Sequence, residues 1–211
     1  MNPLRAGFEV FANGVCRALV GLVDMKMKTR ARRLTEEERI AVEFAVQPGD
    51  ILVDSNDSFP GWQLLSKIFL GSDWVHMGIY VGDGKVIDAG RETHVAEISL
   101  NRFLRTSRVA VLRPHYRGRE DVDKAIARAR DFIGRPYNRA LNPASTTDVY
   151  CTQMLREVLQ SISHPIHVES MNVLGRHIVS PDAFIYNSSI TMVLKTPLSG
   201  VVLAELVDQA A

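Results

Sequence analysis

The 211-residue chain has only two cysteines, almost no net charge and no long uncharged apolar run. Cys16 and Cys151 lie 135 positions apart and belong to no CxxC pair, which excludes a disulfide framework and a structural zinc site with short ligand spacing. The chain has 25 lysine and arginine residues and 24 aspartate and glutamate residues, which gives a net charge of +1. A chain this close to neutral lacks the positive field typical of nucleic-acid-binding proteins, so we expect no nucleic-acid partner.

Charged residues also interrupt the apolar N-terminal region, at Arg5, Glu9, Arg17 and Asp24. No uncharged stretch there reaches about 18 residues, the length needed to span a membrane. The same charges argue against a secretory signal peptide, and we therefore expect a cytoplasmic protein in a reducing compartment. Hydrophobic residues at 46% and charged residues at 23% are typical of a soluble globular domain with a full core.

The N-terminal region has the pattern of an amphipathic helix. Its apolar stripe holds Phe8, Phe11, Val15, Leu19 and Leu22, and the opposite stripe holds Arg5, Glu9, Asn13 and Arg17. Five basic residues follow, at Lys26, Lys28, Arg30, Arg32 and Arg33. Such a helix can pack on its own domain or on a second copy of the chain. Beside a basic cluster it can also make peripheral contact with the inner membrane surface through residues 1–33, and the pattern leaves these interpretations open.

The rest of the sequence predicts an α+β fold. A capping box formed by Thr35 and Glu38 begins a second helix. Strands are predicted at 51–53, 74–81, 85–89, 94–98, 109–113 and 190–195, and helices at 61–70, 100–104, 121–133, 149–162 and 181–186. Because helices and strands form separate blocks, we expect an antiparallel sheet with packed helices. The predicted division is an N-terminal helical extension (1–45), a central domain (46–195) and a C-terminal tail (196–211).

Cys151 stands where a polar loop meets a helical pattern, which places its sulfur in the first turn of a helix. The positive end of the helix dipole favours the thiolate, the reactive form of cysteine. A nucleophilic cysteine also needs a base, and His76, on a strand directly before a hairpin, is the best candidate. A lone cysteine in a helix is more often a core residue. Cys16, with Val15 and Leu19 beside it, fits that second pattern.

Asp88 lies on the return strand of the hairpin and is the candidate that orients His76. A tight two-residue turn at Asp83-Gly84 pairs positions whose numbers sum to 167, which places Asp88 on the sheet face opposite His76. A bulge or an odd-numbered turn is required to bring both residues onto one face. Glu92 and His94 are the alternatives for the orienting role.

The order of these motifs resembles the YiiX-like family, circularly permuted relatives of the NlpC-type cell-wall cysteine hydrolases with a papain-like fold. The landmarks are Gly49-Asp50-Ile51-Leu52, Trp74-Val75-His76-Met77-Gly78-Ile79-Tyr80, Val86-Ile87-Asp88-Ala89, Ile133-Gly134-Arg135-Pro136-Tyr137, Tyr150-Cys151-Thr152-Gln153 and Val179-Ser180-Pro181. They run from about Val46 to Lys195. The histidine precedes the cysteine, which is the reverse of the order in the unpermuted enzymes.

The resemblance implies a cysteine hydrolase that cleaves an amide bond through an acyl-enzyme. Cys151 then matches the nucleophile, His76 the general base, and Asp88 the third catalytic residue, where many members have Glu. Tyr137 matches the tyrosine that precedes the nucleophile and is expected to help bind the oxyanion, together with the Cys151 backbone amide.

The resemblance also indicates the class of substrate. It implies a peptidoglycan-type peptide or an acyl-amide, and the apolar N-terminal helix beside the basic cluster makes a lipid-linked molecule one option. Two alternatives remain open: a thiol-dependent lipid acyltransferase and a non-catalytic ligand-binding module on the same fold.

No cofactor and no metal are expected. His164 and His167 resemble a metal-binding pair, but the proline between them breaks the helix that would align two ligands, so the segment is predicted to be a loop. Trp62, Phe69 and Trp74 can line a pocket for an apolar group, although aromatic residues beside a strand and a helix usually belong to the core.

Overall fold

The computed structural model describes residues 32–55, 63–64, 66–90, 93–173 and 175–198. In this part of the chain the helices are α2 (Glu36–Ala45), α4 (Leu100–Phe103), α5 (Arg119–Arg130), α6 (Cys151–Gln160) and α7 (Asp182–Ile185), with a π-helical turn, η1 (Ser66–Leu70). The strands are β1 (Ile51–Ser55), β2 (His76–Gly82), β3 (Lys85–Ala89), β4 (Val95–Ser99), β5 (Arg108–Pro114), β6 (Met171–Val173), β7 (Arg176–Ile178) and β8 (Ile190–Lys195). Among these described residues, no helix combines the length and the apolar character needed to cross a membrane.

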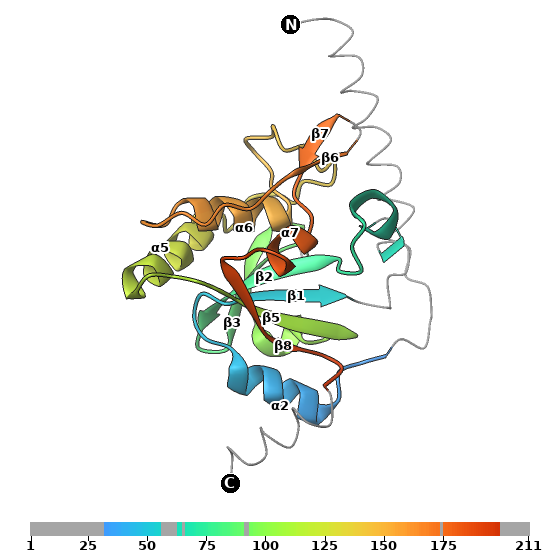
Figure 1. Cartoon of the computed structure of the whole chain (residues 1–211), viewed down its shortest axis with the longest axis vertical. Coiled ribbons are helices and arrows are strands. Elements are labelled where there is room, and N and C mark those ends of the chain that lie inside the picture. The colour runs from blue at the N-terminus through green and yellow to red at the C-terminus, as the bar shows by residue number, and fades with distance from the viewer. Residues whose placement is uncertain (1–31, 56–62, 65, 91–92, 174, 199–211) are drawn as a thin grey trace, which may run out of the picture.

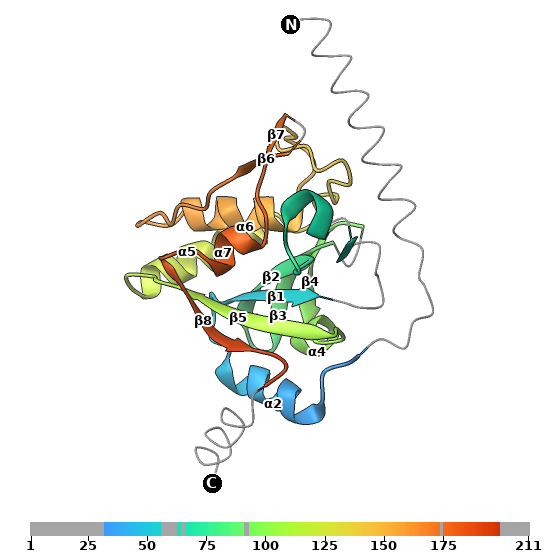
Figure 2. The ribbon, with the colours of Figure 1, turned by 45° about the vertical axis from the view of Figure 1, so that its right-hand side comes forward.

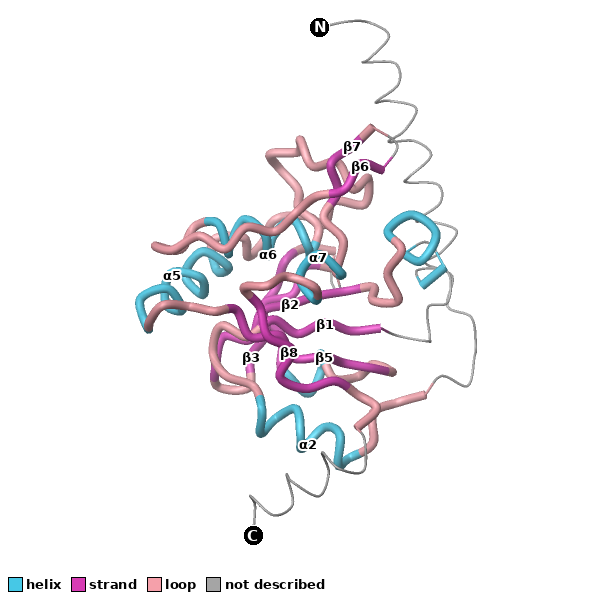
Figure 3. The backbone as a smooth tube through the Cα atoms, in the orientation of Figure 1, coloured by secondary structure: helices cyan, strands magenta, loops and turns pink. Residues whose placement is uncertain are grey.

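Six strands form one sheet in the order β4-β3-β2-β1-β5-β8. Every neighbouring pair in it is antiparallel. β6 and β7 form a separate two-stranded sheet. The tube in Figure 3 shows the large sheet in the middle of the molecule, with helical segments on both sides of it. This arrangement confirms the predicted α+β class.

Helices cover both faces of the large sheet, as Figures 1 and 2 show from two directions. On one face, β1 residue Ile51 belongs to a core that includes Met154 of α6 and residues of α5 and α7. On the other face, Leu52 belongs to a core that includes Val42 of α2 and Phe103 of α4. Because successive strand residues point to opposite faces, the continuous apolar run of β1 fits a strand that is buried on both sides.

The predicted capping box is present at the start of α2. Glu38 N–H donates to Thr35 Oγ1, and the Glu38 carboxylate accepts from the Thr35 N–H. Ala41 and Val42 then bury one side of the helix against the sheet. A helix of the predicted extension therefore packs on the same sheet as the central domain, while the division of the chain into three parts stays a prediction.

The structure differs from the predicted elements at three places. The polar loop expected after Val53 begins later, because Asp54 pairs with His76 and Ser55 with Arg108, which extends β1. Of the helix expected over 61–70, the structure describes two α-helical residues, 63–64, and the short π-helical turn η1. The β6–β7 hairpin was not predicted, since each strand has only three residues. The N-terminal amphipathic helix and the tail beyond residue 198 lie outside the described residues.

Candidate active site

Cys151 is the first residue of α6, as predicted, and is 5% exposed. The N-cap residue, Tyr150, makes no side-chain capping hydrogen bond. The first backbone N–H groups of the helix therefore keep their partial positive charge for an anionic group at the helix start. The apolar side of α6 packs on β2 and β3, which brings Cys151 to the strand pair that carries the other predicted residues.

His76 and Asp88 are hydrogen-bonded, with Nε2 of the imidazole 2.8 Å from Oδ1 of the carboxylate. Both groups are sheltered: the His76 side chain is 14% exposed and that of Asp88 1% exposed. The side chain of Cys151 lies close enough to His76 to contribute to the raised pKa of the imidazole. Because Asp88 engages Nε2, Nδ1 is the ring nitrogen left for the thiol. The structure thus brings the predicted cysteine, histidine and aspartate together in that order.

The shared face of His76 and Asp88 results from a bulge in β2. Next to the turn, Gly82 pairs with Lys85, but the register shifts before Tyr80, which pairs with Val86. Val81 is the extra residue. From there on, the numbers of paired positions sum to 166, so Gly78 lies directly opposite Asp88. His76 lies two residues from Gly78 and therefore on the same face, which meets the requirement stated from the sequence.

Tyr137 lies next to the imidazole. Its backbone N–H donates to the Thr93 carbonyl at 3.0 Å, and it forms an isolated bridge with Val149, two residues before Cys151. Its ring packs on Gly90, as does the ring of His76. A Cβ atom built at Gly90 would lie 3.2 Å from Tyr137 Cε2 and 3.1 Å from His76 Cε1, and φ of Gly90 is +141°. Gly90 thus allows the two rings to approach its backbone closely.

The surroundings of His76 favour its protonated form. Burial opposes the positive charge, but the charge of Asp88, its hydrogen bond and the contact with Cys151 together outweigh burial and raise the pKa of His76 well above its usual 6.5. A histidine beside a thiol can accept the thiol proton, which is the arrangement that a nucleophilic cysteine requires.

The two tyrosines of the site are kept protonated. Burial, followed by the negative charges of Cys151 and Asp88, raises the pKa of Tyr137 well above its usual 10. Burial also raises the pKa of Tyr150 to about 12. A neutral phenol donates a hydrogen bond, so Tyr137 keeps the proton that an oxyanion donor needs.

His94, one of the two alternatives to Asp88 for orienting His76, makes other contacts in the structure. His94 is exposed, forms an isolated bridge with Pro136, and has its Nδ1 3.4 Å from Thr93 Oγ1. Glu92 lies outside the described residues. Trp74, a candidate for lining a pocket, is 6% exposed and belongs to the core.

The two histidines that resemble a metal pair contact different carboxylates. His164 Nδ1 lies 3.1 Å from Asp121, and His167 Nε2 lies 3.3 Å from Glu169. Both are in a segment without helix or strand, as predicted. Over the described part of the chain, no group of three or more His, Cys, Asp or Glu residues is arranged to hold a metal ion.

Two features of the site were not predicted from the sequence. Gly90 follows the strand of Asp88, but its contact with Tyr137 joins residues far apart in the chain. Thr152, beside the nucleophile, is 3% exposed and donates its hydroxyl to the Val179 carbonyl at 2.7 Å. Gly90 directly follows the Val86-Ile87-Asp88-Ala89 motif, and Thr152 lies within the Tyr150-Cys151-Thr152-Gln153 motif. Their place in or beside these family motifs was the only indication of a role that the sequence offered.

Comparisons with known proteins identify the fold and the family of the chain. No curated protein matches the chain. The crystal structure of yiiX from Escherichia coli O157:H7, described as a metalloprotein, is similar to it, with a TM-score of 0.61 and 19% sequence identity over 72% of this chain and 98% of that chain. At this identity the likeness shows the fold alone. Residues 45–203 match the model of the C92 family of permuted papain-like amidase enzymes, YaeF/YiiX, and the chain belongs to this family.

Proposed function

We propose that this chain is a cysteine amidase that cleaves an amide bond through an acyl-enzyme formed on Cys151. The observation that carries the proposal is the linked geometry of three side chains. Asp88 holds His76 Nε2 at 2.8 Å, and His76 contacts the thiol at the start of α6. Membership of an amidase family supports the reaction class.

The first half of the reaction forms a thioester. The Cys151 sulfur, having given its proton to His76, attacks the amide carbonyl carbon and forms a tetrahedral oxyanion. The His76 imidazolium then donates a proton to the leaving nitrogen as the C–N bond breaks. In the second half, His76 accepts a proton from water, which attacks the thioester and releases the acid and the free thiol. Asp88 holds the ring orientation through both halves.

Tyr137 and the backbone N–H of Cys151 are proposed as the donors to the oxyanion. The raised pKa of Tyr137 keeps its hydroxyl protonated, and the open first turn of α6 supplies a backbone donor. Donors fixed in place before the charge develops lower the barrier most effectively. None of the proposed steps requires a metal ion.

The proposed substrate is an amide in a peptidoglycan-type peptide or an acyl-amide, including a lipid-linked one. The amidase family supports the scissile bond. Leu64 and Ile68 are exposed apolar side chains on the segment that leads into β2, which begins at His76, and we propose them as contacts for an acyl substituent.

The test is to trap the acyl-enzyme. The protein is mixed with a panel of peptidoglycan-derived peptides and N-acyl amides, quenched in acid and analysed by intact and peptide mass spectrometry. We expect an acyl adduct on Cys151, lost in Cys151→Ala and retained in the matched Cys16→Ala variant. Hydrolysis that survives Cys151→Ala would contradict the proposal.

Adding a lysolipid or an amine acceptor to the same reaction distinguishes a hydrolase from an acyltransferase. A hydrolase releases free acid at a rate that the acceptor leaves unchanged. Transfer of most of the acyl group to the acceptor would instead favour the lipid acyltransferase. A folded protein that binds these compounds without an adduct would favour a non-catalytic binding module.

A further inference from the structure

One side of α2 is exposed and carries apolar side chains among acidic ones. Glu36, Ile40, Glu43 and Phe44 follow the spacing of a single helical stripe, and all four are exposed. Ile40 is 56% exposed and Phe44 64% exposed. Two large apolar side chains four residues apart form a small surface suited to another apolar element, and the neighbouring carboxylates give that surface a negative charge.

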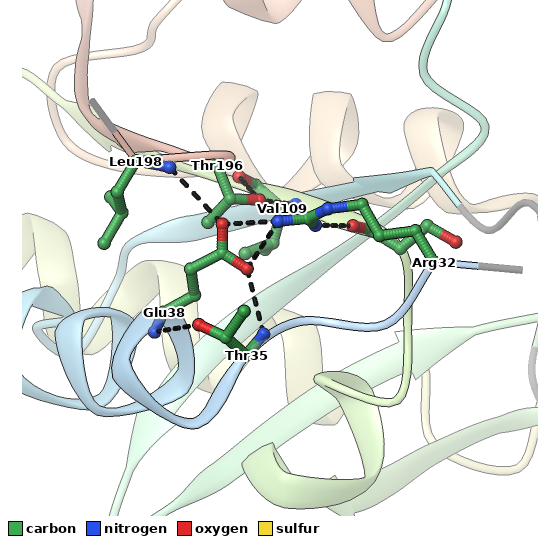
Figure 4. Close-up of polar contacts among 7 residues, drawn as sticks. Arg32, Thr35, Glu38, Val109, Thr196 and Leu198 are labelled. Atoms are coloured by element: carbon green, nitrogen blue, oxygen red, sulfur yellow. Dashed lines mark hydrogen bonds and ion pairs between the residues drawn. The ribbon is translucent and has the colours of Figure 1, made fainter. Parts of the chain in front are cut away.

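The two ends of the described chain meet at the start of the same helix (Figure 4). The Glu38 carboxylate accepts hydrogen bonds from the Arg32 guanidinium at 2.6 Å, from the Thr35 N–H at 3.0 Å and from the Leu198 N–H at 3.3 Å. Residues 1–31 and 199–211 therefore both join the described structure next to α2.

Charge distinguishes the two segments. Residues 1–31 contain five basic side chains, Arg5, Arg17, Lys26, Lys28 and Arg30, against two acidic ones, Glu9 and Asp24. Residues 199–211 contain Glu205 and Asp208 and no basic side chain. The exposed carboxylates of α2, at Glu36, Glu37 and Glu43, attract the first segment and repel the second. They repel an anionic lipid surface as well.

The N-terminal segment also has the length and the apolar stripe that this surface requires. Leu22 ends the predicted stripe, and 11 residues separate it from Leu34, which is buried in the core beside α2. Extended, 11 residues span about 36 Å, whereas the ten residues of α2 extend for only about 15 Å. The predicted helix can therefore fold back along α2.

We propose that residues 1–31 pack on α2, with the apolar stripe that contains Phe11 and Val15 against Ile40 and Phe44. The basic side chains of the segment lie beside Glu36, Glu37 and Glu43. The N-terminal extension is then a helical hairpin whose second helix, α2, anchors it to the sheet. This inference selects one of the interpretations that the sequence left open, and it does not depend on the proposed catalytic activity.

The test measures how well the segment shields α2. A thiol is introduced by Phe44→Cys in a full-length chain that also carries Cys151→Ser, and its alkylation by iodoacetamide is followed by peptide mass spectrometry. Val15→Asp is then added to place a charge in the apolar stripe. Asn13→Asp, on the opposite stripe, is the matched control. We expect Val15→Asp to speed alkylation at position 44 by about tenfold or more, and Asn13→Asp to leave it unchanged.

Other results would overturn the inference. Equal alkylation rates at position 44 in both variants would show that the stripe does not cover Phe44. Protection that disappears on dilution would assign the surface to a second copy of the chain. Protection that appears only with anionic phosphatidylglycerol vesicles would assign the N-terminal segment to a membrane.

Discussion

Asp88 reaches His76 because Val81 adds one residue to β2. Without that residue the hairpin would keep the register of Gly82 with Lys85, and Asp88 would point to the opposite face of the sheet. With it, Asp88 lies opposite Gly78, and its Oδ1 is 2.8 Å from His76 Nε2. A single irregularity in a strand thus determines whether the proposed base has an orienting partner. Bulges beside active sites commonly redirect side chains in this way.

The first prediction concerns the charge of Asp88. Asp88→Asn removes the negative charge that raises the pKa of His76, so the imidazolium is lost at lower pH. In wild-type protein the active imidazolium form persists until the pH rises through the raised pKa. The alkaline limb of the kcat/KM profile should therefore move to lower pH in the variant, with at least about a tenfold lower maximum. Asp123→Asn, on the exposed side of α5, should leave the profile unchanged.

The second prediction concerns the hydroxyl of Tyr137. Tyr137→Phe keeps the ring that packs on Gly90 but removes the proposed oxyanion donor. We expect kcat to fall about a hundredfold with little change in KM, because the lost hydrogen bond forms in the transition state. Steady-state kinetics check this, with Tyr186→Phe as the control, since Tyr186 is 83% exposed. An unchanged kcat would remove Tyr137 from the site.

The third prediction concerns Gly90. In Gly90→Ala the new methyl carbon would lie 3.1 Å from His76 Cε1 and 3.2 Å from Tyr137 Cε2, which is closer than ordinary van der Waals contact. The backbone φ of +141° is also one that residues with a side chain rarely adopt. The rings must shift, and kcat should fall at least about tenfold because small displacements of reacting groups are costly. Gly118→Ala is the matched control, since no atom lies within 4 Å of its added Cβ and its φ is not in the left-handed region. Equal kinetics of the two variants would contradict the packing argument.

The fourth prediction concerns Thr152, which we consider a positioning residue. Thr152→Val preserves the shape of the side chain but leaves the buried Val179 carbonyl without its 2.7 Å hydrogen bond, at a cost of about 1–3 kcal/mol in unfolding free energy. We expect kcat and the alkylation rate of Cys151 to fall together while KM is retained. Thr152→Ser restores the donor and should restore both rates. Stability loss with unchanged alkylation would indicate a purely structural role.

Local sequence signals were sufficient for much of the fold. The Thr35–Glu38 capping box marked the start of α2 because both of its hydrogen bonds span three residues. The strand expected at 190–195 is β8 with the same bounds, since a polar turn precedes it and Pro197 follows it closely. The cysteine in the first turn of a helix and the histidine on a strand before a hairpin were likewise visible as local patterns, although the sequence placed the starts of both elements two residues too early.

The remaining features depend on contacts that local patterns do not contain. The pairing arithmetic required either a bulge or an odd-numbered turn, but it could not choose between them or locate the bulge at Val81, because a bulge depends on the pairing of two strands. The contact between Gly90 and Tyr137 and the hydrogen bond between Thr152 and Val179 join residues from different elements. Such pairs are determined by how α6 and the loops pack on the sheet.

The central claim is that His76 activates Cys151, and the most direct measurement is the rate of iodoacetamide modification at each cysteine between about pH 5.5 and 8. An ordinary thiol is only a few per cent thiolate at about pH 7, so a thiol paired with an imidazolium reacts much faster. We predict that Cys151 is modified far faster than Cys16, and that His76→Ala slows Cys151 alone in protein that remains folded by circular dichroism. His177→Ala, at an exposed histidine, should have no effect. Equal rates at the two cysteines, or modification of Cys151 that is indifferent to the loss of His76, would contradict the account.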